Sequence, residues 1–309
     1  MKVYILDENY NIVKAYYLNN TVIMEQTGTY EDYGIYRRYV SPEPTHETWG
    51  REETGGGINN NTYEYDPRTD TWVEKDSMPT ARWGHVAVAY GGKAYVFGGQ
   101  TTTGLTNVLE AFDPSQPSGQ QWTTKSPMPY SLQGLMAVYL PYDGKIHLFG
   151  GYDGSTYTNL HFTYDPTTDT YDTTTPAAMP HGRNWATCAL INNLIYIIAG
   201  YKHNYNDRYD PSTNTWTTLA PLPISLYGAT RENPVINGII YVTHGQDPPS
   251  PTYYATVYAY DPSINIWAQK TTGMNPRDRV ACVVTNEILL VIGGRYGSTA
   301  YRFNEAYFP

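Results

Sequence analysis

Residues 82–122 decide the fold. They read RWGHVAVAY (82–90), GGKAYVFGG (91–99), NVLEAFDP (107–114) and QQW (120–122). In the first stretch large apolar residues alternate with smaller ones, as in a half-buried strand, and the second is a short apolar run that ends in a glycine pair. Turn residues separate the stretches. The segment therefore predicts four short strands joined by turns.

The turn after the third stretch recurs along the chain. Asp-Pro followed by an aromatic residue begins at Asp66, Asp113, Asp165, Asp210 and Asp261, at intervals of 47, 52, 45 and 51 residues. In such a turn the Asp carboxylate accepts a hydrogen bond from an N–H two residues on, and the Pro presets φ. A second Asp or Asn tolerates the left-handed corner that follows. The intervals indicate a repeated unit of nearly constant length.

Two further signals keep the same register. Glycine pairs close an apolar strand at 98–99, 150–151 and 293–294, and Met-Pro precedes the next unit at 78–79, 128–129 and 179–180. Adjacent glycines permit a sharp exit and let another backbone approach closely. Three independent signals therefore mark one four-stranded repeat.

This pattern resembles the kelch repeat, with its double glycine after the second strand, its Tyr-Asp at the end of the third and its Trp in the fourth. The resemblance covers residues 59–309. It implies an all-β fold, a kelch-type β-propeller of four-stranded blades whose closed ring protects all but short edges. A β-solenoid is disfavoured because its period would be roughly 20–25 residues.

The number of blades depends on residues 1–58. A sixth copy of the third strand at 301–304 favours six blades, with strands from 1–58 completing the first and last. Five blades remain possible, with a separate module at 1–40 and a linker at 41–58. We therefore expect an N-terminal β-rich segment and linker at 1–58, which closes the ring or forms an attachment module, and a propeller at 59–309.

The N-terminal 40 residues carry a second, shorter resemblance. ILDENYNIV followed by DYG is similar to the opening of some tail-tip proteins of phages of Gram-positive bacteria. It implies an assembly partner bound through residues 1–40. The alternative is that these strands simply complete blades.

Composition excludes several partners. The 309 residues carry a net charge of −9, and only 16% are charged, without Lys/Arg blocks, which argues against nucleic acid and anionic membranes. No apolar run is long enough to cross a membrane. No signal peptide is visible, so we expect a cytoplasmic or virion-associated protein. Cys188 and Cys282 occupy equivalent repeat positions and are expected to be small buried residues.

No motif for catalysis or cofactor binding is found. The seven histidines lack metal-ligand spacing, and neither a nucleophile elbow nor a phosphate loop occurs. Asp153, in GYDGST, is expected to form a turn rather than a calcium site. We predict no catalytic residue, no metal and no cofactor.

The resemblance points to one face of the ring as the ligand site. In kelch propellers this face is built by the loop that enters the first strand of each blade and the loop that leaves the second. The planar guanidinium of Arg can donate two hydrogen bonds to a carboxylate or phosphate. The flat rings of Trp and Tyr can stack on sugar rings or bases. The predicted ligand-binding residues are Trp83, His85, Gln133, Tyr152, Arg183, Trp185, Tyr201, Tyr227, Arg277, Arg279 and Arg295. The alternative for each is a structural role between blades.

Three functions follow from this face. The favoured one is a non-enzymatic recognition module that binds a glycan or a protein segment, in its sharpest form a phage or tail-like receptor-binding protein. The second is a mutarotase or epimerase acting on an acidic sugar, with Arg183, Arg277 or Arg279 as the clamp and His85, Asp278 or Glu232 as the acid or base. The third is an intracellular kelch adaptor, ranked last because only 58 residues remain for a partner domain.

Overall fold

The structure is a computed structural model of the 309-residue chain. It describes residues 3–6, 12–16, 23–25, 37–40, 58, 60–66, 71–229, 233–247, 252–270, 272–273, 275–285, 288–292, 294–297, 299–300 and 304–307. Strands and turns make up these residues, and none of them forms a helix that could cross a membrane.

The strands form a series of antiparallel sheets. The first four sheets are β3 (Ile23–Glu25), β4 (Arg37–Val40), β5 (Thr62–Asp66) and β6 (Thr71–Lys75); β7 (Val86–Tyr90), β8 (Lys93–Phe97), β11 (Leu109–Phe112) and β12 (Trp122–Thr124); β13 (Met136–Leu140), β14 (Lys145–Phe149), β15 (His161–Asp165) and β16 (Thr170–Asp172); and β17 (Thr187–Ile191), β18 (Leu194–Ile198), β19 (Asn206–Asp210) and β20 (Thr215–Thr218).

The remaining strands complete the set. A further four-stranded sheet holds β21 (Val235–Ile236), β22 (Ile239–Asp247), β23 (Thr252–Asp261) and β24 (Ile266–Gln269), and a three-stranded sheet holds β25 (Ala281–Thr285), β26 (Ile288–Ile292) and β29 (Asn304–Tyr307). Short two-stranded pairs are β1 (Val3–Leu6) with β2 (Ile12–Tyr16), β9 (Gln100–Thr101) with β10 (Gly104–Leu105), and β27 (Arg295–Tyr296) with β28 (Thr299–Ala300).

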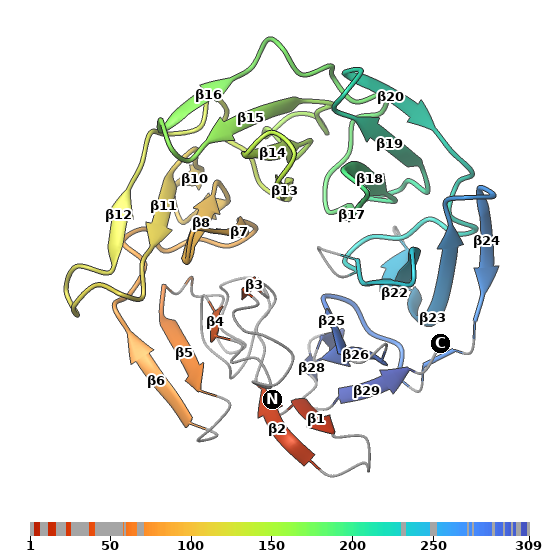
Figure 1. The fold of residues 1–309 in the computed structure, drawn as a ribbon, viewed down its shortest axis with the longest axis horizontal. Helices are drawn as coiled ribbons and strands as arrows, with labels where there is room; N and C mark the ends of the chain where they lie inside the picture. Colours follow the sequence, from red (N-terminus) through yellow and green to blue (C-terminus); the bar gives the residue numbers. More distant parts are fainter. Residues whose placement is uncertain are drawn as a thin grey trace.

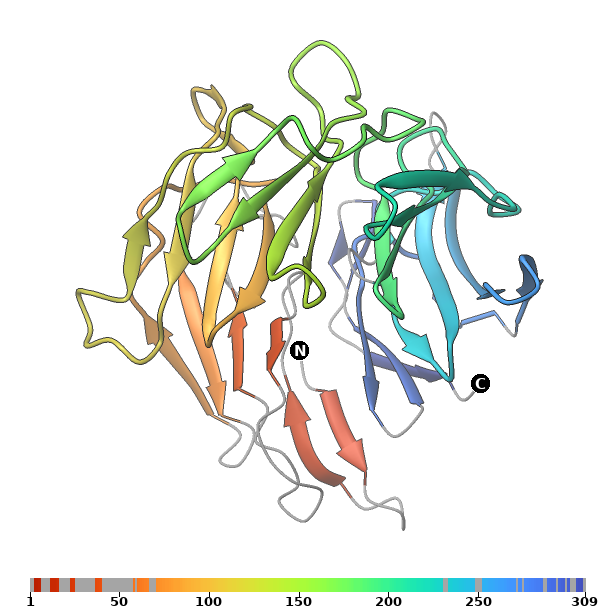
Figure 2. The ribbon, with the colours of Figure 1, turned by 45° about the horizontal axis from the view of Figure 1, so that its top comes forward.

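The sheets stand around a ring, with their first strands at the centre and their fourth strands outside (Figure 1). Turned by 45°, the molecule shows each sheet running from one face of the ring to the other (Figure 2). The predicted all-β propeller of four-stranded sheets is therefore confirmed. The number of blades stays a prediction.

Four described strands, β1 to β4, lie within residues 1–58. β3 and β4 join β5 and β6 in one sheet, in the order β3-β4-β5-β6. The β1–β2 hairpin lies between this sheet and the last one in both views (Figures 1 and 2). The division at residue 58 stays a prediction.

The Asp-Pro turns have the predicted chemistry. The Oδ1 atoms of Asp113, Asp165, Asp210 and Asp261 accept a hydrogen bond from the N–H two residues on, at 2.8–3.0 Å. The later Asp or Asn is left-handed, with φ of 57° at Asp169, 53° at Asn214 and 56° at Asn265. Both expectations for this turn are confirmed.

Aromatic residues after these turns bind each sheet to the one before it. In three of them the indole N–H donates to a backbone carbonyl of the preceding repeat at 2.7–2.8 Å, so the hydrogen bond links two neighbouring sheets. The pairs are Trp122 with Asp76, Trp216 with Ala177, and Trp267 with Ala220. At the equivalent Tyr171, the hydroxyl donates to Ser126 O at 3.1 Å.

The glycine pairs allow sheets to approach closely. Gly99 N–H donates to Leu132 O of the next repeat at 2.7 Å. A β-carbon on Gly98 would stand 2.6 Å from the same oxygen. No side chain fits at this distance, which confirms the reason given for the glycine pair.

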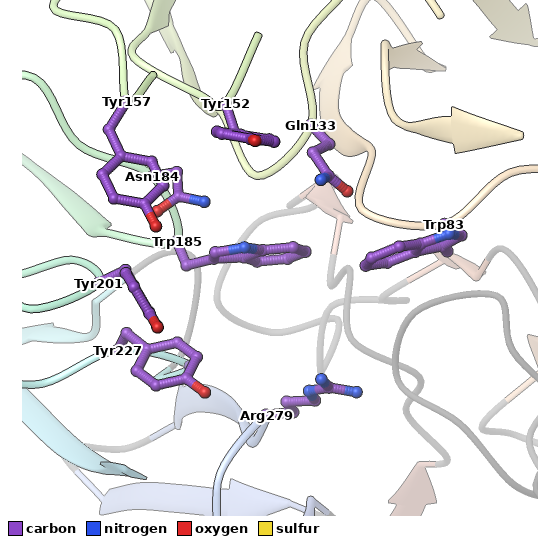
Figure 3. A pocket seen from close by; sticks show the side chains of 10 residues that line it. Trp83, Gln133, Tyr152, Tyr157, Asn184, Trp185, Tyr201, Tyr227 and Arg279 are labelled. Carbon is purple, nitrogen blue, oxygen red and sulfur yellow. The ribbon is translucent and has the colours of Figure 1, made fainter. Parts of the chain in front are cut away.

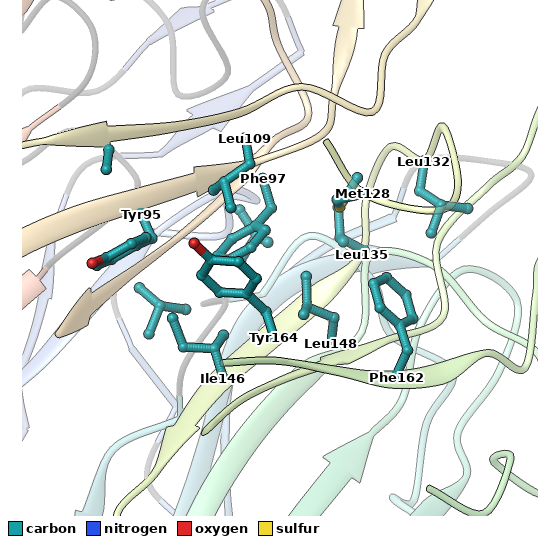
Figure 4. Packing of buried hydrophobic residues seen from close by; sticks show 13 residues of the cluster. Tyr95, Phe97, Leu109, Met128, Leu132, Leu135, Ile146, Leu148, Phe162 and Tyr164 are labelled. Carbon is teal, nitrogen blue, oxygen red and sulfur yellow. The ribbon is translucent and has the colours of Figure 1, made fainter. Parts of the chain in front are cut away.

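The core lies between neighbouring sheets. Phe97, Leu109, Leu148 and Tyr164 are fully buried in one such layer, where the Phe97 and Tyr164 ring centroids are 5.6 Å apart (Figure 4). Cys188 and Cys282 are buried in later layers and form no disulfide, as expected of small buried residues. The layers hold the sheets rigidly and so fix the loops at the mouth of the ring.

Candidate functional site

The mouth of the ring is built from one backbone arrangement repeated in successive sheets. The residue that enters the first strand pairs with a residue that leaves the second, and both N–H···O bonds measure 2.7–3.1 Å. The pairs are Trp83 with Gln100, Gln133 with Tyr152, Tyr227 with Gln246, and Asp278 with Arg295. Backbone groups at these positions are therefore already used.

The next residue in each repeat has a left-handed backbone. φ is 71° at Gly84, 66° at Gly134, 52° at Trp185, 68° at Gly228 and 56° at Arg279. Glycine adopts this conformation without cost, whereas a residue with a β-carbon is strained there by about 1–2 kcal/mol. Trp185 and Arg279 thus stand where three other repeats have glycine.

Bonds between neighbouring sheets hold this conformation. Trp185 N–H donates to Gly134 O at 2.8 Å, and Gly134 N–H donates to Gly84 O at 2.8 Å. Arg279 N–H donates in the same way to Gly228 O. The strained residues are therefore fixed by the scaffold, a situation that is typical of binding and active sites.

A cavity of about 320 Å³ opens at this mouth. Figure 3 shows its side chains, which come from several sheets and surround one space. The lining residues are Trp83, Gln133, Tyr152, Tyr157, Asn184, Trp185, Tyr201, Tyr227, Gly228 and Arg279. The volume is near the lower end for sites that bind small ligands, about 300–1,000 Å³.

Two tryptophans form a flat surface in the cavity. The rings of Trp83 and Trp185 are nearly parallel, at 12°, with centroids 6.3 Å apart (Figure 3). Trp185 lies over backbone of the two preceding repeats: β-carbons on Gly134 and Gly84 would stand 2.9 Å and 3.3 Å from its ring atoms. The indole therefore leaves no room for a β-carbon at Gly134 and little room for one at Gly84.

Tyrosines form a continuous arc along another side of the cavity. Ring centroids are 5.6 Å apart for Tyr152 and Tyr157, 5.5 Å for Tyr157 and Tyr201, and 5.1 Å for Tyr201 and Tyr227. The rings are tilted or edge-to-face, which is the favourable arrangement. Burial raises the pKa of Tyr227 to about 12 and also raises that of Tyr157, so these phenols are neutral hydrogen-bond donors at neutral pH.

Arg279 supplies the charge at the cavity. It is the one ionised side chain among the described residues that line it. Its Nε lies 3.5 Å from Asp278 Oδ2, and Arg295 Nε lies 3.3 Å from Asp278 Oδ1. Asp278 is fully buried, and burial raises its pKa against the opposing effect of the two guanidinium groups. Two cations around one hidden carboxylate leave the mouth locally positive.

Two amides complete the wall. Gln133 Oε1 and Asn184 Oδ1 have no hydrogen-bond partner among the described residues. Buried amide oxygens normally have one.

Comparison with known proteins agrees with the repeat and the fold. The family model of the KLHDC2/KLHL20/DRC7 kelch-repeats domain matches residues 48–225. The chain belongs to the kelch-repeat family.

Curated kelch proteins share part of the chain. Kelch-like protein 15 of Danio rerio is 27% identical over 47% of this chain and 27% of its own length. The F-box/kelch-repeat protein At4g39580 of Arabidopsis thaliana is 32% identical over 46% of this chain and 34% of its own. Kelch repeat and BTB domain-containing protein 12 of Danio rerio is 29% identical over 38% of this chain and 20% of its own. The chain thus spans about a fifth to a third of these relatives.

The kelch structure brings together most of the residues predicted at the mouth. Those that line the cavity are Trp83, Gln133, Tyr152, Trp185, Tyr201, Tyr227 and Arg279. Arg295 lies behind this wall, on Asp278, and His85 is buried with 6% of its surface exposed. Ligand binding by the lining residues stays a prediction.

Arg183 and Arg277 require a correction. Both are fully buried and outside the cavity, so neither reaches a ligand. Arg183 forms an ion pair with the buried Asp207 and donates to Ile197 O at 3.2 Å. Arg277 donates to Asn275 O at 2.9 Å. Their position at the strand entrance serves the core of the repeat.

Arg82 shows the same structural role. Its Nη1 lies 2.8 Å from Glu110 Oε2, with both side chains buried. A buried guanidinium needs such a partner because an unpaired charge in the core is very costly. Arg82 and Arg183 thus each pair with an acid on the third strand of their own repeat.

The candidates for a sugar isomerase are brought together only in part, since one clamp candidate, Arg279, lines the cavity. Two of its three clamp candidates, Arg183 and Arg277, are buried, and Asp278 is engaged by two arginines. Glu232 lies outside the described residues. The described residues also contain no group of His, Cys, Asp or Glu suited to a metal. Asp153 Oδ1 accepts hydrogen bonds from Ser155 N and Thr156 N at 2.7–2.8 Å, as a turn residue does.

Tyr157, Asn184 and Gly228 line the cavity but were not among the predicted residues. Tyr157 lies in the loop that leaves the second strand of its sheet, the same loop that carries the predicted Tyr152. Its neighbourhood in GYDGSTYT carried a signal, because this loop places two tyrosines five residues apart beside a turn. Asn184 and Gly228 flank predicted residues in sequence.

Proposed function

We propose that this kelch chain is a non-enzymatic recognition module that binds a segment of a partner protein in the cavity at the mouth of the ring. The supporting observation is the aromatic lining contributed by several repeats to one concave space. Large, stiff aromatic side chains give contact area at low entropic cost and are enriched where proteins bind one another.

The kelch relatives favour a protein ligand over the other predictions. By their names, two of them carry an F-box or a BTB domain in addition to kelch repeats. A module of this kind within a longer protein fits the adaptor alternative, in which the propeller recognises and another domain acts. The match to residues 48–225 does not reach the tail-type opening at 1–40, so the tail-protein role gains no support from it.

The test is a selection of displayed random peptides on the purified chain, with Trp185→Gly as the counter-selected protein. Glycine is what three other repeats hold at this position, so the variant removes the indole and relieves the strained backbone. We expect peptides that bind the native chain and lose binding to the variant. Tyr142→Ala is the matched control, because Tyr142 is 56% exposed in the turn at the far end of β13.

Two parallel measurements separate the alternatives. A glycan array probed with the same three proteins tests for sugars, and NMR of sialic acid anomerisation tests for the isomerase. The proposal fails if no selected peptide depends on Trp185 while a glycan does, or if anomerisation is accelerated by the native chain and not by Trp185→Gly.

A further inference from the structure

In the part of the cavity rim that the structure describes, the strand edges are already paired. At Trp83, Gln133, Tyr227 and Asp278 the backbone groups are paired with residues of the same repeat, and the N–H of Gly134 is paired with the preceding repeat. A peptide that adds to a sheet needs unpaired N–H and C=O groups in a row. Among the described residues that line the cavity, this mode of binding therefore has no template.

A peptide bound here must be stable without β-sheet hydrogen bonds between its backbone and the propeller. The polyproline II conformation meets this condition, because it has no internal hydrogen bonds and its backbone is solvated. It is also stiff before binding, so little entropy is lost. The absent strand edge thus favours this conformation over an extended β-strand.

The side chains of the cavity match such a peptide. Trp83 and Trp185 present parallel flat rings, and the arc from Tyr152 to Tyr227 faces them (Figure 3). Proline-rich segments dock on aromatic grooves of this type. Phenol hydroxyls donate to the carbonyls of prolines, which themselves have no N–H.

The charge distribution distinguishes acidic flanks from basic ones. No carboxylate lines the cavity among the described residues, so a basic side chain finds no counter-charge there. Arg279 and Arg295 surround a hidden carboxylate, so a Lys or Arg next to the bound segment is repelled. A neutral or acidic flank is accepted.

We infer that the cavity binds a proline-containing segment in the polyproline II conformation, with a proline ring on the Trp185 indole and no basic residue beside it. The inference rests on the proposed function and names its ligand class. Trp185 is the specificity-determining residue, because it replaces a glycine of the repeat and fills the space above Gly84 and Gly134.

The experiment compares two libraries of N-acetylated, C-amidated peptides. One has proline fixed at two positions three residues apart, and the other has alanine at both. Binding is measured by fluorescence anisotropy with the native chain, Trp185→Gly, Tyr201→Ala and Tyr142→Ala. Tyr201→Ala keeps the test informative if Trp185→Gly does not fold, which circular dichroism reports.

We expect binders from the proline library alone, with affinity lowered by about tenfold or more in both cavity variants and unchanged in Tyr142→Ala. Replacing a neutral flank by Lys should weaken binding further. If alanine peptides bind equally well and still depend on Trp185, the polyproline inference is wrong while the proposed function holds. If neither library binds and a glycan binds in a Trp185-dependent manner, both are wrong.

Discussion

The indole of Trp185 lies on the backbone of Gly134, so closely that a β-carbon there would stand 2.9 Å from Cε2. The two residues are equivalent members of neighbouring repeats, and both are left-handed. One repeat thus supplies the large side chain, and its neighbour leaves room for it. This asymmetry gives an otherwise regular mouth its flat aromatic surface.

The first prediction concerns Gly134→Ala. The new methyl group meets the indole and the backbone is strained at φ 66°, so we expect displacement of Trp185 and loss of peptide binding. Gly144→Ala is the control, since Gly144 has a similar φ of 73° and a β-carbon added there would meet no heavy atom within 4 Å. Both variants should lose about 1–2 kcal/mol from the backbone.

The displacement is measured by fluorine NMR of protein labelled with 5-fluorotryptophan. The Trp185 resonance is assigned by its loss in Trp185→Gly. It should shift in Gly134→Ala and stay in place in Gly144→Ala. An unmoved resonance in Gly134→Ala would contradict the packing described above.

The second prediction concerns the buried pair of Arg82 and Glu110. Glu110→Gln leaves the guanidinium without its counter-charge and should lower the free energy of unfolding by about 3–5 kcal/mol. The next repeat has Leu132 and Phe162 at the equivalent positions. The double variant Arg82→Leu with Glu110→Phe should therefore recover most of the loss.

Urea unfolding followed by circular dichroism measures both changes. Equal instability of the single and the double variant would show that the two positions are not exchangeable between repeats.

The third prediction concerns pH. His161 is buried, and burial together with the nearby His147 lowers its pKa to about 3, against the raising effects of the Ala177 carbonyl and Asp143. The unfolded state takes up a proton near pH 6.5 while the folded state does not. The contribution of His161 to the free energy of unfolding is thus complete above pH 6.5. It falls by about 2 kcal/mol on going to pH 5.

The measurement is the free energy of unfolding at pH 7 and pH 5 for the native chain and for His161→Asn. The Asn amide is intended to keep the bond that His161 Nδ1 makes to Ala177 O at 2.9 Å. The variant should lose less stability than the native chain between the two pH values. Identical losses would mean that other groups, such as His181 and His203, carry the whole effect.

The fourth prediction concerns the bonds between sheets. Trp122→Phe removes the N–H that donates to Asp76 O at 2.7 Å and should cost about 0.5–1.5 kcal/mol beyond its packing loss. Trp122→Tyr should cost less, because Tyr171 already makes an equivalent bond through its hydroxyl. Thermal unfolding compares the two, and a less stable Tyr variant would refute the role of the bond.

Much of the fold is predictable because its signals are local. The bond from each turn Asp to an N–H two residues on, and the left-handed Asn214, follow from residues close in sequence. The mouth follows from the repeat register, which places Trp83, Gln133 and Tyr227 at equivalent positions.

The burial of Arg183 depends on a contact that sequence distance conceals. Asp207 lies 24 residues from Arg183, and only the pairing of strands brings the two together. The choice between a ligand contact and a core ion pair therefore needed the structure. Arg279, two residues after Arg277, is the one that turns toward the cavity.

The left-handed position beside each rim pair has a wider consequence. At Trp185 and Arg279 the backbone is held by bonds to the neighbouring repeat, so the side chain there is replaceable without rebuilding the scaffold. Other residues at 185 and 279 would redraw the shape and charge of the opening while every sheet kept its place. New ligand preferences are then reachable in single substitutions.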